Sequence, residues 1–156
     1  MARRFVFRLE TLQRVQALRE REARRQVGTK RAEIARLDAL NAQAAAEIAR
    51  EQAALLARQS GAALDPLWLA RGRTWVAHLR QTIVLRGQEK ALRLKELAVL
   101  QDRWTAARRD LRILEKLRER RFAAYRREQR IRELAEMDEV ARRLQAVPTL
   151  LSGNEA

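Results

Sequence analysis

The sequence predicts an all-α protein, folded as an antiparallel two-helix coiled-coil hairpin whose second helix is longer and overhangs the first. Charged residues make up 35% of the 156 residues and aromatic residues only 4%, with Ala, Leu, Glu and Arg dominant, as is typical of long helices. Residues 60–66 form the one interior segment that combines a glycine, a capping residue and a proline. On both sides of it, apolar residues recur at alternating spacings of three and four, as in a coiled-coil seam.

The first predicted element is a helix over residues 5–60, which ends in a turn over residues 61–65. We expect Gly61 to follow the helix in the left-handed conformation, because glycine can satisfy the last helical carbonyls there without steric cost. A polar seam residue, Asn41, should fix the register of the pair. The predicted seam, which also carries a charge at Glu51, comprises Ile34, Leu37, Asn41, Ala44, Ile48 and Leu55.

The second predicted helix covers residues 66–147. Asp65 is expected to cap its N-terminus, with Pro66 as its first residue, and Pro148 to end it. Gly72 is a weak point at which this helix can break. Its predicted seam comprises Leu97, Leu100, Trp104, Ala107, Leu111 and Leu114. The two helices form one hairpin domain over residues 1–148, and the tail over residues 149–156 is expected to be disordered.

The fold-back at the turn also predicts which residues face each other and where the second helix becomes unpaired. The expected neighbours are Leu12 with Ile113, Leu9 with Lys116, and Phe5 with Arg120. From about Arg121 onward the second helix has no partner in its own chain, although apolar residues continue along it. These residues are Phe122, Tyr125, Leu134, Met137, Val140, Ala141 and Leu144. An apolar stripe on an unpaired helix predicts a binding partner.

Several classes of function are disfavoured. The chain has no cysteine, a single histidine and no glycine-rich phosphate loop, so we expect no metal, no cofactor and no enzymatic activity. No apolar run is long enough to span a bilayer. The net charge of +14 favours acidic partners, anionic lipid or nucleic acid. Arginine alternates with glutamate and the aromatic residues do not form a stacking platform, which argues against nucleic acid as the partner.

A second apolar group lies at the start of the second predicted helix. Its members are Trp68, Leu69, Trp75, Val76, Leu79 and Ile83. They either cover the end of the first helix or bind a partner, and tryptophan is a frequent anchor at protein interfaces. The sequence leaves both interpretations open.

Two segments of the chain resemble a known family. The first is FVFRLETL over residues 5–12, and the second is LEKLRERRFAAYRRE over 114–128 followed by EMDEVA over 136–141. Both resemble the FliJ family, the small coiled-coil component of the bacterial flagellar export apparatus. The resemblance implies a non-enzymatic cytoplasmic stalk at the inner face of the cell membrane. It also implies three partners: the hexameric export ATPase, the cytoplasmic domain of the export-gate membrane protein, and export chaperones.

The resemblance further assigns residues to these partners. The paired ends and the overhang would enter the ATPase ring, and the start of the second helix would contact the gate. The expected ATPase-binding residues are Phe5, Phe7, Phe122, Tyr125, Leu134, Met137, Ala141 and Leu144. The expected gate-binding residues are Trp75, Leu79, Thr82 and Arg86. Three alternatives remain: the equivalent stalk of a virulence type III secretion system, a basic coiled-coil nucleic-acid-binding protein, and a passive scaffold.

Overall fold

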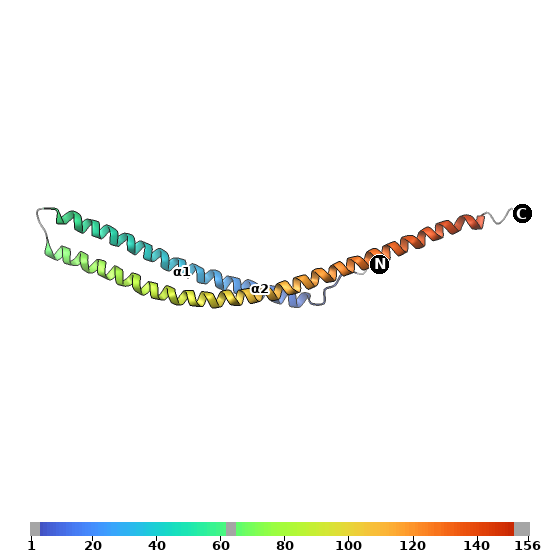
Figure 1. The fold of residues 1–156 in the computed structure, drawn as a ribbon, viewed down its shortest axis with the longest axis horizontal. Helices are drawn as coiled ribbons and strands as arrows, with labels where there is room; N and C mark the ends of the chain where they lie inside the picture. Colours follow the sequence, from blue (N-terminus) through green and yellow to red (C-terminus); the bar gives the residue numbers. More distant parts are fainter. Residues whose placement is uncertain (1–3, 62–64, 152–156) are drawn as a thin grey trace. The chain divides into compact units, whose positions relative to one another are not determined.

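The structure, a computed structural model, describes residues 4–61 and 65–151. These residues form two helices, α1 (Glu10–Gln59) and α2 (Pro66–Leu151), and no strand occurs among them (Figure 1). The two helices pack against each other, so the predicted all-α two-helix hairpin is confirmed. Residues 62–64 of the expected turn and residues 152–156 of the expected tail lie outside the described residues.

The N-terminal segment differs from the prediction, because α1 begins at Glu10 and not near Phe5. The Glu10 amide donates to the Phe7 carbonyl at 3.1 Å, which closes a turn just before the helix. The Phe7 side chain is buried, with only 8% of its surface exposed. One more helical turn at a chain end contributes little, so packing of the phenylalanines against α2 outweighs helix propensity here.

The end of α1 also differs from the prediction. No glycine that the structure describes has a positive φ, so the expected left-handed Gly61 is wrong. Instead, the Gly61 amide donates to the Arg58 carbonyl at 3.1 Å, and the Ser60 hydroxyl donates to the Ala57 carbonyl at 2.8 Å. A tightened last turn and a side-chain donor therefore satisfy two terminal carbonyls without a change of backbone handedness.

The start of α2 follows the prediction. An Asp65 carboxylate oxygen accepts a hydrogen bond from the Leu67 amide at 2.9 Å, as an N-cap does, and the helix begins at Pro66. The helix does not break at Gly72. It also continues past Pro148 and ends one turn later, at Leu151. A proline removes only the hydrogen bond that its own nitrogen would donate, and near a helix end a small bend can relieve its steric clash.

Contacts divide the chain into two compact units, residues 18–108 in one and residues 1–17 with 109–156 in the other. Within residues 18–108, α1 and α2 run side by side in opposite directions (Figure 1). Three pairs fix their register: Glu20 with Trp104, Lys30 with Glu96, and Asp38 with Lys90. In an antiparallel pair, the numbers of two facing residues add up to a nearly constant value. This value is nearly the same for the three observed pairs as for the expected neighbours, so the predicted register is confirmed.

Burial along this unit follows the predicted seam. Val27 is the most buried residue, with 2% of its surface exposed, and Ala44 and Leu55 are also buried. The remaining predicted seam residues of both helices are half-buried or buried, as expected where only one face of each helix is covered. The Asn41 side-chain oxygen is buried and lacks a hydrogen-bond partner among the described residues. A buried, unpaired amide oxygen destabilises the pair, in keeping with a seam residue that sets register rather than strength.

Candidate partner-binding surfaces

The unpaired part of α2 is fully accessible. Every described residue of α2 from 130 to 146 is exposed. The overhang stripe, which we define as Leu134, Met137, Ala141 and Leu144, follows one face of this segment at spacings of three and four. The exposed fractions of Leu134, Met137 and Leu144 are 60%, 62% and 68%. Together with Glu133, Glu136 and Val140, most of this stripe lines a shallow hollow on the helix surface.

The overhang begins later than predicted. The expectation that α2 loses its partner from about Arg121 is wrong, because Phe5 packs on the next turn of α2. Its ring lies 5.2 Å from that of Phe122, edge to face, and 5.6 Å from that of Tyr125. Three of the residues assigned to the ATPase, Phe5, Phe122 and Tyr125, thus form one aromatic cluster. A fourth, Phe7, is buried next to Phe5 along the chain. The other four form the overhang stripe.

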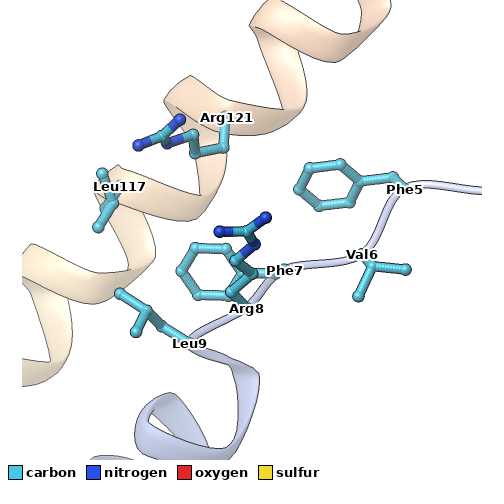
Figure 2. A pocket seen from close by; sticks show the side chains of 7 residues that line it. All are labelled: Phe5, Val6, Phe7, Arg8, Leu9, Leu117 and Arg121. Carbon is cyan, nitrogen blue, oxygen red and sulfur yellow. The ribbon is translucent and has the colours of Figure 1, made fainter.

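The non-helical segment before α1 forms a strap along α2, which we define as residues 4–9. Figure 2 shows that the rings of Phe5 and Phe7 lie on the side of the strap that faces α2, whereas Val6 points away. Leu9, Leu117 and the guanidinium groups of Arg8 and Arg121 complete a pocket of about 490 Å³, which we call the strap pocket. It has an apolar floor, two cations and no carboxylate among its lining residues.

The residues assigned to the gate differ in what they present to solvent. Trp75 is 43% exposed, and its indole nitrogen donates to a Glu47 carboxylate oxygen at 3.0 Å. Its ring stacks on that of His78, with the ring centres 5.5 Å apart. Leu79 is buried in the seam, with 7% of its surface exposed. Leu79 therefore holds the two helices together.

The other two gate-assigned residues also face α1. The Arg86 guanidinium donates to the Leu40 carbonyl at 3.3 Å, and Arg86 is half-buried. The Thr82 hydroxyl donates to the His78 carbonyl at 3.0 Å, within its own helix, and Thr82 is half-buried too. Of the four residues, Trp75 offers the most accessible contact surface. The structure brings all four to one stretch of α2, but it places three of them partly or wholly in the seam.

The apolar group at the start of α2 has one side in the seam and one side exposed. Val76 is buried against α1, as expected if this group covers the end of that helix. Trp68 is half-buried, and the Arg58 guanidinium lies 4.3 Å from the centre of its ring. Ala70, Arg71, Thr74, Trp75 and His78 line a shallow hollow on the outer side of α2. The seam side of the group is thus structural, and its outer side is open to a partner.

The middle of the seam contains a charged network that sequence reasoning missed. The Lys30 ammonium group lies 2.8 Å from carboxylate oxygens of both Glu33 and Glu96, and its side chain is only 15% exposed. Arg93 bridges the same two carboxylates at 3.7 and 3.4 Å. The hydrogen bonds that Lys30 donates, to Glu33 first and then to Glu96, raise the pKa of Lys30, and the hydrogen bond from Lys30 lowers the pKa of Glu96. The signal in the sequence was the seam spacing of Arg86, Lys90 and Arg93.

No group of three or more potential metal-ligating side chains occurs within residues 4–61 and 65–151. Over the same residues, neither helix contains a stretch long and apolar enough to cross a membrane. The surfaces that stand out are therefore the overhang stripe, the strap pocket and the face around Trp75.

Comparison with known proteins gives one match. The family model described as the flagellar FliJ protein matches residues 5–148. No curated protein and no solved structure matches the chain. The matched region contains α1, the strap from Phe5 onward, and nearly all of α2.

Proposed function

The chain belongs to the FliJ family of flagellar export components, and we propose that it is a non-enzymatic stalk that inserts its overhang into the hexameric export ATPase and stimulates it. The single observation that most supports this proposal is the overhang stripe. A helix end with a continuous exposed apolar face requires a partner, and this face lies beyond the point at which α1 can cover it. Because the family is flagellar, the equivalent stalk of a virulence secretion system is the less favoured reading.

The shape of the overhang suits insertion into a ring. From residue 130 to residue 146 it is a single helix without a neighbouring element, so it is only about 10–12 Å across, side chains included. Such a rod can enter an opening that a globular domain cannot. The exposed leucine and methionine side chains would then lie against the inner wall, and methionine adapts well to irregular apolar surfaces.

We further propose that the outer face of α2 around Trp75 contacts the cytoplasmic domain of the export-gate protein. Trp75 is the gate-assigned residue with an accessible side chain, and the adjacent hollow includes Arg71 and His78. Leu79, Thr82 and Arg86 would act indirectly, by keeping this part of α2 paired with α1. The protein would thereby lie in the cytoplasm, at the inner face of the membrane that holds the gate. Escort of export chaperones is the third activity that we propose from family membership.

A paired set of variants tests the ATPase proposal. Met137→Asp combined with Leu144→Asp places two carboxylates on the overhang stripe. Ala135→Asp combined with Ala146→Asp is the matched control, because both alanines are exposed and lie on the opposite face of the same segment. All four side chains are exposed, so the paired region should keep its helicity in both variants. Stimulation of the purified export ATPase should be lost in the first variant and retained in the second.

A further inference from the structure

The strap pocket combines features that suit one kind of ligand. Its apolar surface comes from Phe5, Phe7, Leu9 and Leu117, and Arg8 of the strap and Arg121 of α2 also line it (Figure 2). Phe7 is 8% exposed and therefore belongs to the floor, whereas Arg8 and Arg121 are exposed at the rim. A volume of about 490 Å³ is within the range in which ligand-binding pockets occur.

Within the described part of the chain, the two rim arginines have no counter-charge. Neither Arg8 nor Arg121 makes an ion pair or a hydrogen bond with a residue that the structure describes. The nearby carboxylates on α2 have other partners. Those of Glu115 and Glu119 lie 3.2 and 3.9 Å from the Arg112 guanidinium, and that of Glu128 lies 3.8 Å from Arg132. The two guanidinium groups at the pocket are thus available to a carboxylate from outside.

The surrounding charge points to the same sign of ligand. Residues 109–132 contain ten basic side chains and four acidic ones, whereas residues 133–146 contain two basic and four acidic ones. The excess positive charge of this half of the chain is therefore concentrated around the strap pocket and not along the overhang stripe. A partner that approaches this end meets a cationic surface with an apolar recess in it.

From this charge complementarity we propose that the strap pocket binds an acidic protein segment with a large apolar side chain between its carboxylates. The apolar side chain lies against Phe7 and Leu117, and flanking carboxylates accept charge-assisted hydrogen bonds from Arg8 and Arg121. This inference rests on the proposed function, since it assigns the segment to the export ATPase, as a contact separate from that of the overhang stripe. Apolar anchors surrounded by polar contacts are the usual organisation of strong interface contacts.

A charge-reversal experiment tests this assignment. Arg8→Glu combined with Arg121→Glu removes the two rim cations. Arg109→Glu combined with Arg126→Glu makes the same change in net charge at exposed α2 residues that do not line the pocket. Circular dichroism of both full-length variants checks that the helices remain intact. The affinity of the first variant for the purified ATPase should fall at least about tenfold, and that of the second should change by less than about twofold.

A peptide experiment tests the chemistry independently of the ATPase. The probe is a fluorescent peptide of sequence Asp-Glu-Leu-Phe-Glu-Asp, titrated with the full-length protein and followed by fluorescence anisotropy. Two comparison peptides replace the leucine and phenylalanine by serine, or the acidic residues by lysine. The first peptide should bind more tightly than both, and the Arg8→Glu, Arg121→Glu variant should abolish the difference. A labelled oligothymidylate at 200 mM salt is the comparison for a nucleic-acid ligand.

The outcomes separate this inference from the proposed function. If the wild-type protein stimulates the ATPase and the pocket variant binds it equally well, the pocket assignment is wrong and the stalk proposal stands. If both charge-reversal variants lose affinity equally, the attraction is general and the pocket assignment is wrong. The assignment is also wrong if the oligothymidylate binds at least as tightly as the acidic peptide and this binding depends on Arg8 and Arg121. If the wild-type protein neither binds nor stimulates the ATPase, the stalk proposal fails and the assignment of the segment to that enzyme fails with it. The peptide titration then decides the chemistry of the pocket alone.

Discussion

Replacing Leu79 by alanine should destabilise the hairpin because it leaves a cavity in the seam, whereas replacing Trp75 should change mainly the outer surface of α2. Leu79 is 7% exposed and lies in the seam, and truncation of a buried leucine to alanine costs about 2–5 kcal/mol. The seam of a two-helix protein can partly close over the cavity or admit water, so we expect about 2–3 kcal/mol here. Trp75 is 43% exposed, so its truncation removes the hydrogen bond to Glu47, worth about 0.5–1.5 kcal/mol, and the apolar contacts of the covered part of its ring. Alanine's higher helix propensity offsets about 0.5 kcal/mol of this loss.

Urea unfolding followed by far-ultraviolet circular dichroism measures both free energies of unfolding. Binding to the cytoplasmic domain of the gate protein is then measured at a temperature where both variants are folded. We expect Trp75→Ala to weaken gate binding by more than its loss of stability explains. Leu79→Ala should lower stability, and it should weaken gate binding only as far as the helix pair loosens. An unchanged free energy of unfolding for Leu79→Ala, with strong loss of gate binding, would refute the assignment of Leu79 to the seam.

Two further predictions concern stability. Gly87→Ala should raise the free energy of unfolding by about 1 kcal/mol, because an added methyl group there meets nothing within 4 Å and alanine favours the helix. Gly72→Ala should not stabilise the protein, because its new methyl group would lie 2.9 Å from a methyl carbon of the buried Leu55. Thermal unfolding of both variants tests this contrast, and an equal gain in stability for the two would contradict it. Glu96→Gln should destabilise at neutral pH and have a smaller effect in strong acid. The pKa of Glu96 is lowered below 4.5. The stability that its charge contributes is therefore present above pH 4.5 and is lost as the pH falls through the lowered pKa. If the effect of Glu96→Gln on the free energy of unfolding does not shrink in acid, Glu96 does not have this role.

Much of the fold could be predicted because coiled coils show their geometry in the spacing of apolar residues. The alternation from Leu97 to Leu114 predicts the seam of α2, and the single breaker segment predicts where the chain reverses direction. A hairpin with one turn has only one free variable, the register. For that reason the pairing of Trp104 with Glu20, and of Glu96 with Lys30, agreed with the predicted sum of residue numbers.

What the sequence did not show depends on contacts between distant residues. Phe5 and Phe7 have the spacing of an extended segment as well as that of a helix start, and only the proximity of Leu117 and Phe122 decides between them. The same contacts create the strap pocket, which no local motif announces. Gly72 was expected to be a weak point because glycine lowers helix propensity, whereas the structure places it where side chains of α1 leave little room for an added methyl group.

The gate-assigned residues show why a face cannot be inferred from a family pattern alone. Trp75 and Leu79 are four residues apart and so lie on neighbouring lines of α2, one at the edge of the seam and one inside it. Beyond them, at Arg86, Lys90 and Arg93, three successive seam positions are cationic. They are matched by carbonyl or carboxylate groups of α1. Partly exposed ion pairs add little to stability, so the cohesion of residues 18–108 must come from apolar side chains, Ile34 within this stretch and the layers on either side of it. A partner that binds near Trp75 therefore acts on a part of the helix pair that a polar stretch separates from the apolar layers around Val27.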